Sequence, residues 1–237
     1  RVPTASRRQR ASGATIAIVE DRDAPRVALR MSIAAGSASD TERAGAAIVA
    51  AHAIALSIED QAAALGARVD VTVAPDAATF AIDVAPDAVT PAIELLAGLA
   101  KAAAPSAPLV SRATRRAALE AKRLAAEDDE HAAAYVIVRD AYDLPTARHP
   151  YGTASATAAE IAEVTPADVR AITTARYVAA ASTLVVVGDV AAADAMTTAE
   201  RALAAASPKP LPRLDLTEPF SRDHDRVTLV DRPGAPS

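Results

Sequence analysis

The alternation of apolar and polar residues predicts strands in the first part of the chain. The segment Ala14–Glu20 is apolar and β-branched, and Arg26–Ala34 alternates in part, so we expect two strands that are neighbours in a sheet. Arg68–Ala74 and Thr79–Val84 also alternate, and a Pro-Asp turn lies between them. This second pair is typical of a hairpin.

Helical periodicity and an alanine-rich composition predict a series of helices, because alanine has the best intrinsic helix propensity. Capping residues support several boundaries: Gly66 follows one helix, and Thr165 precedes Pro166 at the start of another. The predicted helices span residues 42–57, 60–64, 87–103, 112–126, 131–142, 157–162, 166–177 and 191–205.

Two later segments predict further strands. Thr183–Gly188 is apolar throughout, which predicts a strand buried on both faces. Arg226–Val230 is predicted as a last strand, and no partner strand follows it. Because strands and helices come in blocks along the chain, the predicted fold class is α+β.

The composition excludes several classes of protein. The net charge is −5, from 25 basic and 30 acidic residues, whereas a nucleic-acid-binding protein normally carries a basic patch. The one dense basic run, RRQR at residues 7–10, is interpreted as a solvated terminal segment, with a contact to an anionic partner as the alternative. The absence of cysteine excludes disulfides, thiolate catalysis and cysteine-bound zinc. Since no apolar run reaches the ~20 residues that span a bilayer, we expect no integral membrane protein.

Several local strings, in the same order along the chain, resemble the pitrilysin-type zinc metallopeptidases, which include insulinase and mitochondrial processing peptidase. The resemblance covers the chain from about Gly13 onward. The strings are AAGSASD at 34–40, AGAAIVAAH at 44–52, LGARVD at 65–70, HPYG at 149–152, VTPADVRAI at 164–172, LVVVGDV at 184–190 and VTLVDRPGAP at 227–236.

The resemblance implies a domain organisation, because halves of these peptidases face one another like a clamshell around a peptide chamber. This chain would form one such half, with a sheet of mostly antiparallel strands flanked by helices. We expect an arm over residues 1–13, a first domain over 14–163, and the start of a second, similar domain over 164–237. The second domain is expected to be incomplete, because the family's Gly-rich loop and Ser-Arg-Leu stretch are absent. The family's Gly-Thr loop is also absent after Ser57, where we favour missing residues over a deletion.

The family's chemistry rests on the helical motif His-x-x-Glu-His, in which two His bind zinc and the Glu is the general base. Positions i, i+3 and i+4 share one helix face. In this chain they are occupied by Ile48, Ala51 and His52. The third ligand of the family is a carboxylate on a later helix, where Glu120 is nearest in character and Lys122 takes its place in another register. The resemblance therefore implies no zinc, no other cofactor and no catalytic residue in this chain.

The four histidines have ordinary structural interpretations as well. His52 is interpreted as a partly exposed helix residue, with a pH-sensitive contact as the alternative. His149 is assigned to a structural turn, with a ligand as the alternative, and His131 is interpreted as solvated. His224 lies between two aspartates in a Pro-rich segment, a setting that argues against a cation site there. No nucleophile elbow, phosphate loop or calcium loop accompanies the serines, the glycines or the acidic run at 127–130.

These expectations combine into a functional hypothesis. We expect a non-catalytic subunit that pairs with an active, zinc-bearing member of the same family and helps to bind a peptide or unfolded protein segment. The alternative is a structural or assembly subunit of a larger complex, since some relatives of the family have become core subunits of respiratory complexes. An enzyme active by itself would need ligands that this sequence does not supply. Because many bacterial relatives work in the cell envelope, we expect a periplasmic or envelope location.

Overall fold

The computed structural model describes most of the chain. The described residues are 5–10, 12–40, 43–101, 103–127, 133–134, 136–138, 141–142, 149–153, 156–204, 206, 209–214 and 227. The predicted helix at 131–142 lies in part outside these residues, and the predicted strand at 226–230 lies outside them except for Val227.

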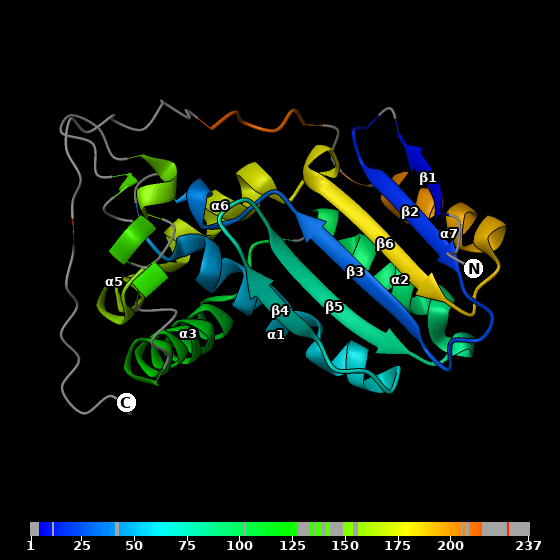
Figure 1. The fold of residues 1–237 in the computed structure, drawn as a ribbon, viewed down its shortest axis with the longest axis horizontal. Coiled ribbons are helices and arrows are strands. Elements are labelled where there is room, and N and C mark those ends of the chain that lie inside the picture. Colours follow the sequence, from blue (N-terminus) through cyan, green and yellow to red (C-terminus); the bar gives the residue numbers. More distant parts are fainter. Residues whose placement is uncertain are drawn as a thin grey trace.

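A single mixed sheet forms the centre of the described fold (Figure 1). Its strands lie in the order β1-β2-β6-β3-β5-β4, and all neighbours are antiparallel except β2 and β6. This arrangement confirms the predicted α+β class, the mostly antiparallel sheet and the β4–β5 hairpin. The strands are β1 (Ala5–Gln9), β2 (Thr15–Glu20), β3 (Val27–Ile33), β4 (Asp70–Val73), β5 (Ala78–Val84) and β6 (Ser182–Gly188).

β6 is one of the two middle strands of the sheet, and its position corrects the predicted pairing. β2 and β3 were expected to be neighbours, but β6 lies between them, parallel to β2 and antiparallel to β3. Val186 pairs with Ile18 on one side and with Leu29 on the other. The prediction was wrong because alternation identifies a strand but not its partner. The most apolar strand takes an interior place in the sheet, although it is the last of the six in sequence.

The sheet crosses the domain boundary that was expected between residues 163 and 164. β6 and the helix after it lie beyond that boundary, yet β6 holds together two strands that precede it. We propose that the first domain extends at least to Ala204, the last residue of α7.

The helices follow the order of the predicted series, with differences at several of their ends. α1 is one continuous helix through Ser57, whose hydroxyl donates to the Ile54 carbonyl at 2.7 Å, so the expected break after residue 57 is absent. α3 was predicted to begin at residue 112, but it begins at Ala107, with Pro108 in its first turn. The helices are α1 (Ala46–Ala64), α2 (Val89–Ala97), α3 (Ala107–Glu127), α5 (Ala158–Ala162), α6 (Pro166–Arg176) and α7 (Ala192–Ala204), and the 3₁₀ turns are η1 (Ser37–Ser39), η2 (Pro86–Ala88), η3 (Gly98–Lys101), η4 (Pro150–Thr153) and η5 (Ala179–Ala181).

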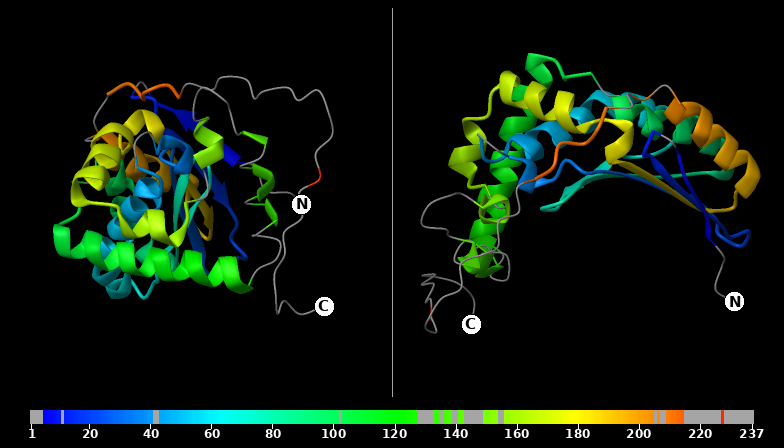
Figure 2. Two further views of the ribbon diagram at one scale, coloured as in Figure 1. Left: turned by 90° about the vertical axis from the view of Figure 1, so that its left-hand side faces the viewer. Right: turned by 90° about the horizontal axis from the view of Figure 1, so that it is seen from above.

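The helices cover one face of the sheet, and the other face is concave and uncovered by them (Figure 2). α1, α2 and α7 pack directly on the strands, while α3 and α6 pack against α1. On β3 and β6 the residues therefore alternate between buried and half-buried, and β6 is not buried on both faces as predicted. Its outward valines gave an apolar run that a local pattern does not distinguish from a strand covered on both sides.

The core lies between the sheet and the three helices that pack on it. Phe80 of β5 is fully buried and meets the ring of Tyr177 edge-on, with 6.3 Å between the ring centroids. α1 is buried on most of its circumference, because the sheet, α3 and α6 all contact it. Its many alanines allow these neighbours to approach closely from several sides.

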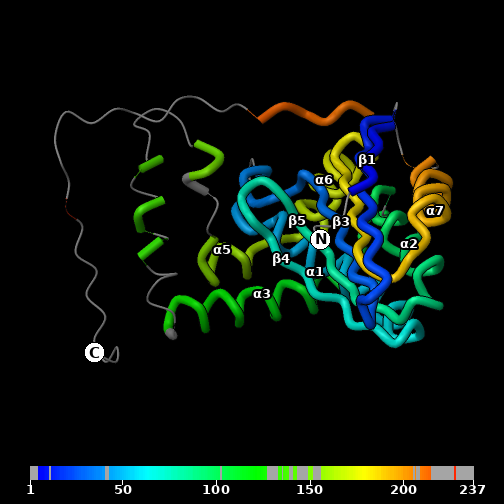
Figure 3. The backbone as a smooth tube through the Cα atoms, turned by 45° about the vertical axis from the view of Figure 1, so that its right-hand side comes forward, coloured from blue at the N-terminus to red at the C-terminus, as the bar shows by residue number. Residues whose placement is uncertain are grey.

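The segment predicted as an N-terminal arm contains an edge strand. β1 pairs antiparallel with β2, and Figure 3 shows it beside that strand, with α7 nearby. The side chain of Arg8 reaches Glu200 on α7 at 2.7 Å. Most of the basic run thus belongs to an exposed edge strand of the sheet. Arg8 and Arg10 of this run both reach Glu200 on α7.

Asp40 positions the start of α1. Its carboxylate accepts hydrogen bonds from the backbone N–H groups of Gly45 at 2.8 Å and Ala47 at 2.7 Å, which lack partners inside the helix. Gly45 is left-handed (φ 87°), and a Cβ there would lie 2.8 Å from Ile161. The helix therefore begins at Ala46, four residues after the predicted start.

Removal of β6 tests the sheet topology. We expect a fragment ending at residue 163 to lack a cooperative fold, because β2 and β3 lose the strand that joins them. A fragment ending at Ala206 keeps every strand of the sheet, and we expect it to unfold cooperatively. Far-UV circular dichroism across a urea titration measures both, and equal cooperative transitions would contradict the topology.

The pH dependence of stability tests the burial of Asp40. Burial raises the pKa of Asp40 to about 7, against the opposing effect of the two N–H donors. Because this folded-state value lies above the ordinary one, the stabilising contribution is complete below about pH 4 and is lost as the pH rises to about 7. We expect Asp40→Asn, which cannot ionise, to remove this loss, which is ~4 kcal/mol at most.

The measurement is the free energy of unfolding of both proteins from pH 4 to pH 8. Asp60→Asn, on the exposed part of α1, is the matched control and should keep the wild-type slope. A difference between Asp40→Asn and wild type that does not change with pH would show that Asp40 does not titrate in this range.

Candidate functional site

The motif positions lie on the first half of α1, whose start Asp40 fixes. Ile48 and His52 are half-buried one turn apart, and Ala51 is fully buried. The i, i+3, i+4 spacing keeps the three side chains toward one side of the helix, as the family's motif requires. Only His52 has a side chain that can bind a metal or exchange a proton.

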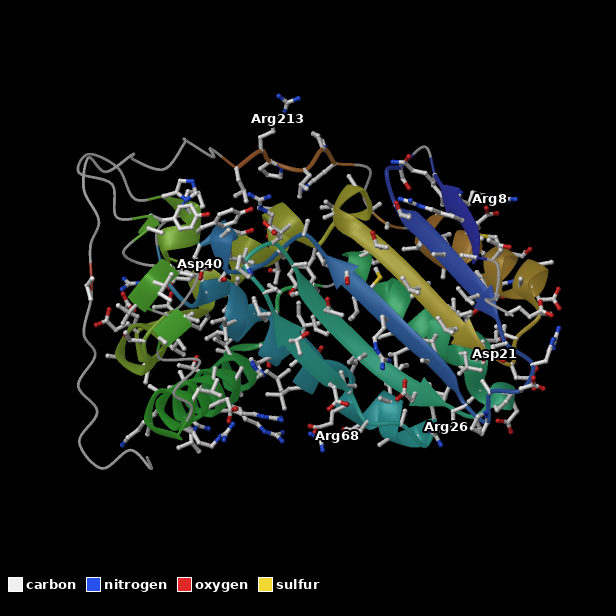
Figure 4. All side chains as sticks on the ribbon, viewed as in Figure 1. Arg8, Asp21, Arg26, Asp40, Arg68 and Arg213 are labelled. Atoms are coloured by element: carbon white, nitrogen blue, oxygen red, sulfur yellow. The ribbon has the colours of Figure 1, made fainter. Side chains whose placement is uncertain are left out.

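A pocket of about 240 Å³ opens beside His52, between α1, β4 and α3. β4 is the last strand of the sheet on this side, so the pocket lies at a sheet edge. Figure 4 places Arg68 at the edge of the molecule just before β4. The lining residues are His52, Ala55, Leu56, Glu59, Arg68, Val69, Asp70, Val71, Thr72 and Arg116.

Glu120, the candidate for the third ligand, lies on α3 but does not line this pocket. Its carboxylate accepts two hydrogen bonds from Arg123, at 2.7 and 3.1 Å, and these lower the pKa of Glu120. The α3 residue that shares the pocket with His52 is Arg116, one helical turn before Glu120. Lys122, the alternative, faces a different groove.

Burial is the main cause that lowers the pKa of His52 below its ordinary value. The positive charge of Arg116 lowers it further, and the negative charge of Glu120 opposes both. His52 is therefore a neutral imidazole near pH 7, able to donate one hydrogen bond and accept another.

The donor set does not fit a catalytic zinc. Such a site needs three protein ligands and an open position. Ile48 is aliphatic and Ala51 supplies no base, so of the three motif positions only His52 offers a ligand, and the guanidinium of Arg116 lines the pocket beside it. Within the described ranges, no three His, Asp or Glu side chains lie together in a way that could hold a metal.

The other histidine in the described part of the chain has a structural role. His149 is 4% exposed, and its Nδ1 accepts a hydrogen bond from the Tyr151 backbone at 3.1 Å. Its ring stacks on Tyr142 at 4.6 Å, and the Tyr151 hydroxyl donates to Asp76 at 2.7 Å. This turn ties η4 to the β4–β5 hairpin. His131 and His224 lie outside the described residues.

Sequence reasoning missed Arg116. The sequence prediction named Glu120, or Lys122 in another register, as the α3 residue near His52. The signal was present in the spacing, because Arg116 and Glu120 are four apart and share a helix face. The register between α3 and α1 decides which of the two faces the pocket, and only the packing of the two helices fixes that register.

A second, larger groove of about 740 Å³ lies between α3, α5 and the start of α6. Its lining is mostly apolar and includes Val110, Leu119 and Val164. It has no His, Asp or Glu among its lining residues, so it offers no acid–base chemistry.

Neither a family model nor a curated protein matches this sequence. Solved structures do. The chain is 25% identical to the inactive domain of an M16 peptidase from Pseudomonas fluorescens, with a TM-score of 0.74 over 92% of this chain and 54% of that one. It is 17% identical to the periplasmic protease PqqL from Escherichia coli (TM-score 0.75, 93% of this chain, 26% of that chain). Its identity to pitrilysin is 16% (TM-score 0.76, 93% and 25%).

The chain thus spans about half the length of the Pseudomonas domain and about a quarter of PqqL and pitrilysin. The similarity to PqqL and to pitrilysin is a similarity of fold. The Pseudomonas structure, which is more similar in sequence, is an inactive domain. Together with the ordered strings, they show that the chain has the fold of the pitrilysin-type (M16) peptidases, and α1 lacks the His-x-x-Glu-His motif.

Proposed function

We propose that this chain is the non-catalytic subunit of a pitrilysin-type metallopeptidase assembly. In this proposal it pairs with an active, zinc-bearing member of the same family and supplies part of the wall of a peptide-binding chamber. The observation that carries the proposal is the motif helix. α1 keeps its place and its capping, while Ile48 and Ala51 stand where a ligand and the base are needed.

The uncovered face of the sheet supports a role in binding. Its outward residues are half-buried and small on β2 and β6, as at Ala17 and Val185. The polar groups on this face are largely paired with one another: Ser32 bonds to Thr79 at 2.8 Å, and Arg30 pairs with Asp83 at 2.9 Å. A broad, concave surface of this kind suits an extended peptide better than a small molecule, which needs an enclosed pocket.

The free edge of β4 supports the same role. β4 ends the strand order, so one side of its backbone has no strand partner within the described sheet. An extended segment can add to such an edge through main-chain hydrogen bonds, which accept many sequences. The edge adjoins the pocket that His52 lines.

For the cellular location we propose the cell envelope. The support is the similar PqqL, a periplasmic protease. Among the described residues, no helix combines the length and apolar character needed to cross a bilayer.

Reconstitution tests the proposed function. We expect the purified chain to leave unfolded protein substrates intact, and to co-purify with a chain that carries His-x-x-Glu-His. Proteolysis should appear on mixing the two and disappear with a chelator or with Glu→Gln in the partner's motif. Chelator-sensitive proteolysis by this chain alone would overturn the proposal. Co-purification with membrane respiratory subunits instead would favour the structural alternative.

Rebuilding the ligand set tests whether zinc was lost through these side chains. We expect the wild type to bind no stoichiometric zinc. Ile48→His with Arg116→Glu places two imidazoles one turn apart and a carboxylate across the pocket, and should gain zinc binding. The measurement is competition against a chromophoric chelator. Ile48→His with Arg115→Glu is the matched control, because Arg115 faces the other groove, and it should bind zinc more weakly. Equal affinities would place Arg116 away from the ligand position.

A further inference from the structure

The pocket beside His52 carries one cation without a partner. Arg116 lines it, and within the described part of the chain Arg116 forms no hydrogen bond and no ion pair within 4.0 Å. Neighbouring arginines on the same helix are engaged: Arg112 pairs with Glu59 at 3.5 Å, and Arg123 pairs with Glu120 at 2.7 Å. Arg116 is therefore the available guanidinium on this side of α3.

The two carboxylates that line the pocket are each matched by another cation. Asp70 pairs with Arg68 at 3.3 Å, and Glu59 pairs with Arg112. The charge that remains at the pocket is the positive charge of Arg116. Glu120 attracts Arg116 from one turn away, but its oxygens are bonded to Arg123 and it does not line the pocket.

His52 adds a hydrogen-bonding group on the opposite wall. It is half-buried on α1, facing the α3 side that carries Arg116. As a neutral imidazole it can donate to an oxygen that Arg116 also contacts. A guanidinium and an N–H donor across a small space match the oxygens of a carboxylate, which accept bidentate and single hydrogen bonds.

The size and place of the pocket limit the ligand. A volume of about 240 Å³ is below the ~300–1,000 Å³ of drug-sized ligand sites, so it fits one side chain or one chain end. Val69, Val71 and Thr72 from the edge strand β4 form another wall. A peptide along that edge would present one residue to the pocket.

We propose that this pocket, in the place of the lost metal site, binds a carboxylate of a peptide ligand through Arg116 and His52. The proposal rests on the proposed peptide-binding function and names its preferred ligand, an acidic peptide. The carboxylate has two sources, an internal Asp or Glu side chain and a free C-terminus.

The test measures the affinity of the purified full chain for labelled peptides by fluorescence anisotropy. One set of alanine-based peptides carries a central Glu, Gln or Lys with both ends blocked, and a second set has a free or amidated C-terminus. We expect one carboxylate source to raise affinity about five- to tenfold over its neutral counterpart, with the advantage shrinking at high salt. The two sets distinguish the side chain from the chain end.

Variants assign the effect to the pocket. Arg116→Gln should abolish the preference for the carboxylate, and Arg116→Glu should reverse it in favour of the Lys peptide. Arg115→Gln removes the same charge from the neighbouring position, which lines the other groove, and should keep the wild-type preference. Thermal melting confirms that all variants are folded.

The outcomes separate this inference from the proposed function. If wild type binds Glu, Gln and Lys peptides equally, or if Arg115→Gln and Arg116→Gln weaken binding alike, the carboxylate pocket is overturned while peptide binding stands. If no peptide binds at all, the pocket is overturned as well, and the reconstitution with a zinc-bearing partner decides the proposed function independently.

Discussion

The fold depends on β6, which joins two parts of the sheet that have no direct contact. Its hydrogen bonds run parallel to β2 on one side and antiparallel to β3 on the other, and its inward residues Leu184 and Val186 are fully buried. The β1–β2 pair is attached to the rest of the sheet through this strand. Because β6 comes roughly 150 residues after β3 in the chain, its pairing closes a long loop, and such pairing is favourable only together with the core that it completes.

The position of β6 also fixes where the helices lie. α1 packs on β4 and β5, α2 on β3 and β5, and α7 on β2, so the three helices span both sides of β6. α3 and α6 pack against the side of α1 that does not face the sheet. The alanine-rich surface of α1 is therefore buried on nearly every side. Asp40 and Gly45 set the first residue of that helix, and with it the positions of Ile48, Ala51 and His52.

The motif positions of α1 lie on a helix whose start is fixed by Asp40, yet two of them, Ile48 and Ala51, have side chains without acid–base or metal-binding groups. Ala51 fits a fully buried position where a carboxylate would need a partner or a metal. Ile48 and Ala51 supply no metal ligand and no general base, so the motif positions do not provide the groups that a catalytic zinc needs. The half-open pocket at the sheet edge persists because β4, α1 and α3 still pack as walls.

The sequence by itself determined the strands β2 to β6, most helix positions and the α+β class. It also determined that Ile48 and Ala51 occupy the motif positions of a ligand and of the general base. These follow from local periodicity, capping residues and a short helical motif, all of which act within a few residues. Only the tertiary structure decided that β6 separates β2 from β3, that α1 continues through Ser57, that residues 5–9 form a strand, and that Arg116 lines the pocket beside His52 while Glu120 does not. Each of these depends on which distant segments pack together, and a local sequence pattern does not identify the segment that packs against it.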